Sequence, residues 1–240
     1  MAAVLTRVLH SFVLAMNRLI WRYSPVSRSG FLSSDQLSWV APLERGFETI
    51  RDELDANLLA ERERLAPVHE IMGYASPDAD GGARWNSYLL VFYGHAFPEN
   101  WSRCPRTLEY LQRIPGLVSA FVSVLSPGGW LPPHQGAYAG VLRGLFALHV
   151  PPDKERCTIR FGEDVRHWNA GECMVFDDTA THEVKNEASG DRVVIYLDVL
   201  RPLPWPLSWL NRAMIRVLRH TFFKQPERNY RLWQQRQQLA

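Results

Sequence analysis

Two of the eight histidines stand in settings that suit chemistry. His134 lies in Pro-Pro-His-Gln-Gly, and His182 follows the Asp- and Thr-rich run 177–181, so each adjoins turn residues at the end of a predicted strand. In a small β-barrel, two histidines far apart in the chain can meet at the mouths of their strands and bind one metal ion, because imidazole suits iron, zinc and copper. We expect surface or packing positions for the isolated histidines His10, His69, His95 and His220.

An arginine follows the second histidine at a distance that would complete a small-molecule site. Arg192 comes ten residues after His182, across a predicted turn at residues 186–190. If the flanking segments form a hairpin, the two residues are offset by about three positions, or roughly 10 Å at about 3.4 Å per residue. That gap suits a five-carbon dicarboxylate held by a metal at one end and a guanidinium at the other. Alternatively, both histidines are ordinary turn residues and Arg192 pairs with Asp191 or Asp198 at the surface.

The elements that must position these side chains are mostly short strands. The chain has 240 residues, of which 46% are hydrophobic and 12% aromatic, so it is long and apolar enough to bury a core. Segments rich in β-branched and aromatic residues predict strands over 88–93, 118–125, 141–150, 157–161, 172–176, 182–185 and 192–200. Helices are expected over about 43–65 and 105–113. Because no long helices separate the strands, the pattern predicts a mostly β fold, an antiparallel sandwich or barrel with flanking helices.

Both ends of the chain predict basic amphipathic helices. Apolar residues recur at helical spacing in the first 23 residues, and arginines gather on another stripe. The same pattern returns after the prolines at positions 202, 204 and 206. We therefore expect a helix within 1–25, a β-domain over 26–204 and a helical extension over 205–240. Such helices suit the surface of an anionic membrane; the alternative is that they pack on the barrel or on a partner subunit.

Composition limits the compartment and the partners. No run of 18 apolar residues occurs and charges interrupt the first apolar stretch, so neither a membrane-spanning helix nor a cleaved signal peptide is expected. The three cysteines form no C-x-x-C pair, which fits a reducing compartment. A formal net charge of only +2 gives no indication of a nucleic-acid partner. We expect a cytoplasmic protein that can lie peripherally on the inner face of the membrane.

Several pieces between Ser123 and Pro202 together resemble a known family. In order they are S-V-L-S-P-G-G-W-L-P-P-H-Q-G, L-R, C-T-I-R, W-N-A-G-E, V-F-D-D-T-x-x-H-E-V and R-V-V-I-Y-L-D-V-x-R-P. Their order and spacing are similar to those of the aspartyl/asparaginyl β-hydroxylases, Fe(II)- and 2-oxoglutarate-dependent oxygenases related to bacterial lipid A hydroxylases. The resemblance implies a double-stranded β-helix (jelly-roll or cupin-like) barrel with supporting α-helices. It also implies a dioxygenase that hydroxylates an unactivated C–H bond with 2-oxoglutarate and O2 as cosubstrates.

The resemblance also implies roles for individual residues. Carried over position by position, it makes His134 and His182 the ligands of Fe(II). Arg192 and Ser123 would hold the distal carboxylate of 2-oxoglutarate, and Arg143 would face the same pocket. The two histidines and Arg192 are therefore the predicted catalytic residues.

One departure from the wider superfamily concerns the third metal ligand. Most members have a carboxylate two residues after the first histidine, where this chain has Gly136. The same absence occurs in the protein-hydroxylating branch, in which water fills the position, and it predicts weaker retention of the metal. Asp178 is the nearest substitute. We favour the interpretation that Asp177 or Asp178 caps the turn or orients a ligand or a water from outside the metal's own shell.

A second departure concerns the substrate. Protein-hydroxylating members have R-x-R-x-H in the strand after the first ligand, whereas this chain has Val-Leu-Arg-Gly-Leu over 141–145. The loss argues against an acidic substrate side chain, because a buried carboxylate needs charge-assisted partners. His149 is expected deeper on the same face. With the basic helices, the pattern favours a lipid acyl chain as substrate. The alternatives are a β-hydroxylase of Asp or Asn in proteins or of a small amino acid, and an inactive barrel that serves as a binding module.

Overall fold

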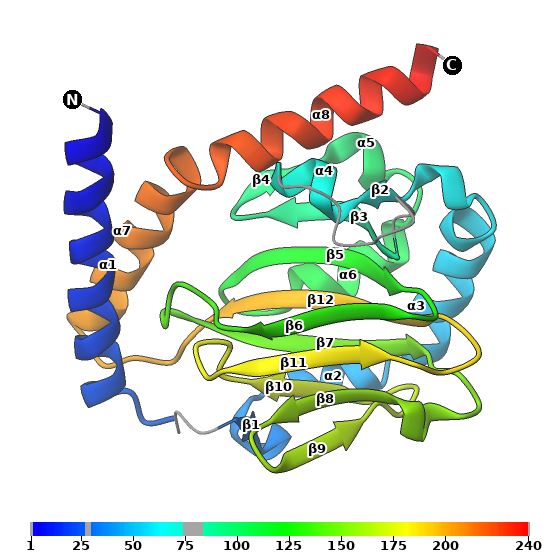
Figure 1. The fold of residues 1–240 in the computed structure, drawn as a ribbon, viewed down its shortest axis with the longest axis horizontal. Helices are drawn as coiled ribbons and strands as arrows, with labels where there is room; N and C mark the ends of the chain where they lie inside the picture. The colour runs from blue at the N-terminus through cyan, green and yellow to red at the C-terminus, as the bar shows by residue number, and fades with distance from the viewer. Residues whose placement is uncertain (1, 27–29, 74–83, 240) are drawn as a thin grey trace.

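Two antiparallel sheets form the centre of the protein in a computed structural model, which describes residues 2–26, 30–73 and 84–239 (Figure 1). The strands of the larger sheet are β1 (Phe31–Leu32), β2 (Ala66–Pro67), β3 (Trp85–Phe92), β4 (His95–Ala96), β5 (Leu117–Leu125), β7 (Val141–His149), β10 (Cys173–Phe176) and β12 (Arg192–Leu200). Those of the smaller sheet are β6 (Gly129–His134), β8 (Cys157–Phe161), β9 (Asp164–His167) and β11 (His182–Asn186). All seven predicted strands are present, with ends shifted by three residues or fewer.

From β5 to β12 the chain passes repeatedly between the two sheets. The larger sheet has the order β1-β10-β7-β12-β5-β3-β2, with β4 beside β3, and the smaller one has the order β6-β11-β8-β9. Strands β5, β12, β7 and β10 therefore face β6, β11, β8 and β9, which is the arrangement of a jelly roll. The predicted fold class is confirmed.

The sequence pattern does not indicate β6 and β9. β6 contains Pro132 and Pro133, which lack N–H donors and are typical of turns. Prolines are tolerated there because β6 is an edge strand that pairs only with β11. β9 is a short, largely exposed strand at the opposite edge and has no apolar alternation.

The hairpin considered for His182 and Arg192 does not form. β11 pairs with β6 and β8, whereas β12 pairs with β5 and β7, so the chain changes sheets between them. The side-chain amide of Asn186 supports this crossing by donating to the carbonyl oxygens of Leu125 (2.7 Å) and Gly190 (2.9 Å). The offset of about three residues along one ladder is therefore wrong, because successive strands of a jelly roll can lie in opposite sheets.

The helices surround the roll. They are α1 (Ala2–Tyr23), α2 (Val40–Glu44), α3 (Phe47–Leu54), α4 (Val68–Met72), α5 (Pro98–Trp101), α6 (Pro105–Gln112), α7 (Leu207–His220) and α8 (Lys224–Leu239), with 3-10 turns at Ser34–Gln36, Arg62–Arg64 and Lys154–Arg156 and a π-helical turn at Asp55–Leu59. The helix expected over 43–65 is divided into α2, α3 and the π-helical turn. At the break, a β-carbon on Gly46 would lie 2.5 Å from the ring of Tyr110, so the close approach of α6 requires glycine there.

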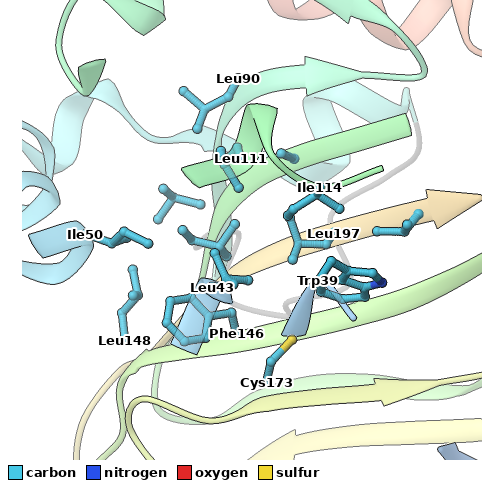
Figure 2. Packing of buried hydrophobic residues seen from close by; sticks show 14 of the residues in the cluster. Trp39, Leu43, Ile50, Leu90, Leu111, Ile114, Phe146, Leu148, Cys173 and Leu197 are labelled. Atoms are coloured by element: carbon cyan, nitrogen blue, oxygen red, sulfur yellow. The ribbon is translucent and has the colours of Figure 1, made fainter. Parts of the chain in front are cut away.

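One face of the larger sheet is covered by α2, α3 and α6. Leu43, Ile50 and Leu111 from these helices pack with Phe146 and Leu197 of the sheet (Figure 2). Full burial of such side chains contributes about 1.5–3 kcal/mol each. The opposite face of this sheet is turned toward the smaller sheet, where the predicted site residues lie.

The terminal helices α1 and α7 lie at one end of the molecule, and α8 contacts α4 (Figure 1). Met16 and Ile20 of α1 join Met214 and Leu218 of α7 in one buried cluster. Each helix thus packs one face on the body, while the part of the predicted stripe before residue 10 lies outside the described side chains. Within the described part of the chain, no helix is long and apolar enough to cross a membrane.

Candidate active site

His134 and His182 are neighbours across two strands. His134 ends β6, His182 begins β11, and the two residues are paired in the antiparallel ladder. Their ring centroids lie 4.2 Å apart. His182 is buried and stacks on Phe161, with 5.0 Å between ring centroids, whereas His134 is half-buried. The structure therefore brings together the two imidazoles that the sequence placed at strand ends.

The same kind of hydrogen bond orients each imidazole. Nδ1 of His134 lies 2.7 Å from the carbonyl oxygen of Pro132, and Nδ1 of His182 lies 2.9 Å from that of Ala180. Because a carbonyl only accepts, Nδ1 of the neutral ring carries the proton and Nε2 keeps its lone pair. Burial lowers the pKa of His182 to about 4, which keeps this ring neutral at neutral pH. Two Nε2 atoms presented in this way fit a divalent metal such as Fe(II).

Arg192 is a buried cation, and no ion pair joins it to a carboxylate of the described residues. Its guanidinium lies 3.4 Å from Oγ of Ser123 on β5 and 4.9 Å from the ring centroid of Trp168. Its Nε has no hydrogen-bond partner in the described structure. Burial lowers the pKa of Arg192 to about 10, so the group stays charged at neutral pH. A buried charge without a counterion, at the wall of a cavity, fits an anionic ligand.

Arg143 lines the same cavity but is already paired. It donates to Oδ1 of Asp198 from Nε (3.1 Å) and Nη2 (3.0 Å), and it forms an ion pair with Asp178. Burial acts to lower the pKa of Arg143, but the two carboxylates outweigh burial and raise that pKa well above its ordinary value. Because Asp198 serves Arg143, it is not the surface partner considered for Arg192. The cosubstrate role of Arg143 stays a prediction, and its ion pairs suit it better to orienting Asp178.

Asp178 stands beside the histidine pair. Its Oδ1 lies 3.5 Å from Nε2 of His182. A β-carbon on Gly136 would lie 1.8 Å from its Oδ2, so a side chain at position 136 would need the space that Asp178 occupies. Asp177 has the turn-capping role, since its Oδ1 accepts the main-chain N–H of Thr179 over 3.0 Å. Among the described residues, no group of three or more His, Cys, Asp and Glu side chains is arranged to hold a metal.

A cavity of about 1080 Å³ joins these groups. The predicted site residues all line it: Ser123, His134, Arg143, His182 and Arg192. The volume is at the top of the roughly 300–1,000 Å³ range of small-molecule pockets, which leaves room for a second ligand beside a five-carbon dicarboxylate. The cavity continues between the terminal helices as an apolar arm lined by Val13, Leu14, Ile71, Met72, Leu218 and Phe222.

The apolar positions of β7 have the predicted setting, but His149 does not. Val141 and Leu145 line the cavity. His149 was expected on the same face, yet it does not line the cavity, and its Nε2 lies 2.6 Å from Oδ1 of Asp55. The reason is a register shift opposite β12, which ends the strict alternation of β7 before residue 149.

Sequence reasoning missed two cavity residues on β3. Trp85 donates its Nε1–H to Oγ of Ser123 over 2.9 Å and so fixes this hydroxyl beside Arg192. Ser87 is buried against the cavity, and its Oγ has no hydrogen-bond partner in the described structure. The available signal was the alternation in W-N-S-Y-L-L, which puts residues 85, 87 and 89 on one face of the strand.

Comparisons with known proteins identify the family of the chain. The family model of the aspartyl/asparaginyl beta-hydroxylases matches residues 44–202. Over 235 residues the chain is 31% identical to an ornithine lipid ester-linked acyl 2-hydroxylase of Rhizobium tropici, covering 98% of this chain and 83% of that protein. It is 27% identical over 192 residues to human aspartyl/asparaginyl beta-hydroxylase, covering 76% of this chain but only 25% of that protein.

Solved structures also include a similar protein. A 2-oxoglutarate-Fe(II) oxygenase-family oxidoreductase of Burkholderia pseudomallei aligns with a TM-score of 0.39 and 12% identity, covering 53% of this chain and 71% of that one. Family membership itself rests on the sequence matches, which include two thirds of the chain in the family model and nearly all of it in the Rhizobium relative. The chain belongs to the aspartyl/asparaginyl beta-hydroxylase family and is a hydroxylase of this group of Fe(II)- and 2-oxoglutarate-dependent oxygenases.

Proposed function

We propose that this hydroxylase acts on the acyl chain of a membrane lipid, with Fe(II) held by His134 and His182 and with 2-oxoglutarate and O2 as cosubstrates. The observation that carries the proposal is one cavity lined by a histidine pair, by a buried cation that forms no ion pair with any described carboxylate, and by an apolar arm. These three features suit a metal, an anion and a long apolar group respectively. An inactive binding barrel has no need of all three together.

The polar residues that line the cavity would each have a separate role. Nε2 of His134 and Nε2 of His182 would hold Fe(II), which when bound supplies O2 activation coupled to decarboxylation of 2-oxoglutarate to succinate. Arg192 would bind the distal carboxylate through charge-assisted hydrogen bonds, with the Ser123 hydroxyl as a further donor. The buried ring of Trp168 packs on the guanidinium and helps to fix its position.

Asp178 would act next to the metal rather than on the substrate. Its buried carboxylate forms an ion pair with Arg143, which fixes its position beside His182. In this proposal, Asp178 orients a water molecule that takes the third ligand position on the metal, where the chain has no carboxylate of its own. This assignment agrees with the two-histidine arrangement, in which water takes the place of the superfamily's third carboxylate.

The apolar arm supports a lipid rather than an acidic side chain. The Rhizobium relative is named for 2-hydroxylation of an ester-linked acyl chain. Hydroxylation at that carbon, next to the ester, leaves the rest of the chain to extend from the metal in one direction. The arm between α1, α4 and α7 offers an apolar path of this kind. The match to that relative includes the terminal helices, since it covers 98% of this chain.

An exposed face on the same helices supports contact with an anionic membrane. Trp209, Arg212 and Arg216 follow an i, i+3, i+7 pattern on the exposed side of α7, and Trp205 lies in the turn directly before the helix. The side chains of Trp205 and Trp209 are 83% and 67% exposed. Helices α1 and α7 contain six arginines and no acidic residue. Tryptophan at the headgroup level and arginine against anionic lipid both stabilise peripheral binding. We place the protein on the cytoplasmic face of the membrane through this face.

Loss of both exposed tryptophans is expected to release the protein from anionic vesicles. The double variant Trp205→Ser, Trp209→Ser lowers the partition coefficient by about tenfold or more, since inserted apolar surface contributes about 25 cal/mol per Å². Trp130→Ser is the control, because Trp130 is 52% exposed but belongs to β6. Co-sedimentation with vesicles measures the effect. Wild-type protein that stays in the supernatant with anionic vesicles contradicts the membrane proposal.

The lipid assignment is tested with purified protein, Fe(II), 2-oxoglutarate and vesicles that contain an ester-linked ornithine lipid. We expect succinate and a lipid heavier by one oxygen atom on its ester-linked chain, read by mass spectrometry. Leu14→Trp is expected to lower kcat/KM by about tenfold or more, because overfilling an apolar site costs about 1–3 kcal/mol. Leu19→Trp is the matched control, since Leu19 is a similarly exposed leucine of α1 that does not line the cavity. Turnover with Asp- or Asn-containing peptides alone contradicts the lipid assignment.

A further inference from the structure

Residues 135–140, here called the strap, connect His134 to the turn that precedes His182. The strap begins directly after the first histidine of the pair and runs to the start of β7. The side-chain amide of Gln135 donates to Oγ1 of Thr181 over 2.7 Å, and the main-chain N–H of Gly136 donates to the carbonyl oxygen of Asp178 over 2.7 Å. The strap is thus bonded to the turn that precedes the second histidine, and its position affects both halves together.

Asn17 of α1 holds the middle of the strap. Its Nδ2 donates to the carbonyl oxygen of Ala137 over 3.0 Å, and its Oδ1 accepts the N–H of Ala139 over 2.9 Å. The side chain of Asn17 is only 4% exposed, and among the described side chains of α1 no other polar one is buried. A polar group in an otherwise apolar face costs stability unless its hydrogen bonds are made. Both ends of this amide are used on the strap.

Asn211 of α7 holds the end of the strap in the same way. Its Nδ2 donates to the carbonyl oxygen of Gly140 over 2.8 Å, and its Oδ1 accepts the hydroxyl of Tyr138 over 2.7 Å. A β-carbon on Gly140 would lie 2.1 Å from Oδ1 of Asn211, so the helix is closed directly against the main chain of the strap. Asn211 is 1% exposed.

We propose that Asn17 and Asn211 are positioning residues of the hydroxylase: they fix the strap from two helices outside the roll, and through it the place of His134 relative to His182 and Asp178. The inference rests on the proposed function for the metal at this site, but not for the identity of the substrate. Because α7 also presents Trp209, Arg212 and Arg216, which are proposed to contact the membrane, the strap joins that face to the proposed metal ligands.

The test replaces each asparagine by leucine, which has a similar volume and cannot form the two strap bonds. Asn229→Leu is the matched control, since Asn229 joins α8 to the body by donating to the carbonyl oxygen of Ile71 over 2.9 Å and does not contact the strap. The measurement is the dissociation constant of Mn(II) for the full-length protein, from the electron paramagnetic resonance of free Mn(II). We expect a rise of about tenfold for Asn17→Leu and for Asn211→Leu, as for other supports of metal ligands.

The control distinguishes positioning from general stability. All three variants are expected to lower the melting temperature, but Asn229→Leu leaves the Mn(II) dissociation constant unchanged. At saturating metal, the KM for 2-oxoglutarate also stays unchanged in the strap variants, because neither Arg192 nor Ser123 bonds to the strap. Unaltered Mn(II) affinity in both strap variants, or an equal loss in Asn229→Leu, overturns the inference.

A milder variant keeps the test decisive if the leucine variants do not fold. Tyr138→Phe removes the hydroxyl bond to Asn211 and leaves the main-chain bonds of the strap in place. It is expected to weaken Mn(II) binding in the same direction by a smaller factor, and unchanged affinity contradicts the inference. Wild-type protein that binds no Mn(II) contradicts the proposed metal site itself, which separates that failure from a failure of the strap.

Discussion

Replacement of His182 by alanine lowers Fe(II)-dependent succinate formation by about 10³-fold or more. The substitution removes one of the two proposed metal ligands, and a bound metal contributes several kcal/mol to such a reaction, with about 1.4 kcal/mol for each factor of ten. The buried imidazole is neutral because burial lowers the pKa of His182 to about 4, so its loss removes no charge from the core. Stopped assays that quantify succinate at saturating 2-oxoglutarate measure the effect.

The control for this variant is His149→Ala. His149 bonds to Asp55 and does not line the cavity, so its removal is expected to leave turnover within about twofold. Mn(II) binding, measured in parallel, is expected to be lost in the His182 variant and retained in the His149 variant. Retained turnover in His182→Ala, with folded protein and fresh Fe(II), would make the histidine pair a structural feature and exclude it as the metal site.

Arg192→Met is expected to weaken the binding of 2-oxoglutarate and to stabilise the ligand-free protein against unfolding. The KM for 2-oxoglutarate rises by roughly 10- to 100-fold, because a hydrogen bond between charged groups contributes about 1.5–3 kcal/mol. At the same time, the free energy of unfolding in the absence of ligands rises by about 1–3 kcal/mol, since an apolar side chain of similar size replaces a buried charge that has no counterion among the described residues. Succinate assays at varied 2-oxoglutarate measure the KM, and denaturant titrations without ligand measure the free energy of unfolding.

A second buried arginine provides the matched control. Arg201 pairs with Asp177 over 2.5 Å, and both side chains are fully buried. Arg201→Met therefore leaves an unpaired buried carboxylate and is expected to lower the free energy of unfolding by about 3–5 kcal/mol. Opposite signs for the two variants indicate that Arg192 is kept for a ligand. A stability loss in Arg192→Met equal to that of Arg201→Met contradicts this explanation.

Local patterns were sufficient for most of the fold. The seven predicted strands follow from apolar alternation and turn residues, which depend on neighbours along the chain. The two strands of the smaller sheet that were not predicted, β6 and β9, are its edge strands, where prolines and exposed polar residues are tolerated because one side of the strand makes no ladder. The two-residue strands β1, β2 and β4 are too short to give a periodic pattern. The helix predicted over 43–65 is interrupted because Gly46 admits Tyr110 from a helix more than 60 residues away in the chain.

The candidate site also has features that the sequence predicted and features that it could not predict. The positions of His134 and His182 at strand ends could be read from turn chemistry beside each residue. The sequence could not show that Arg143 is engaged by Asp178 and Asp198, because these three residues lie on separate segments. It also could not show that Trp85 fixes the hydroxyl of Ser123, which depends on the neighbouring strands β3 and β5.

The amino-acid sequence by itself determined which residues can bind a metal or an anion and which face of its strand each one takes, since side-chain type and alternation are local properties. Only the tertiary structure decided that Arg192, from the opposite sheet, lines the same cavity as the two histidines, and that α1 and α7 line the apolar arm and hold the strap. The physical reason is that sheet pairing and helix packing are set by the burial of apolar faces from distant segments, and many pairings are compatible with one periodic pattern.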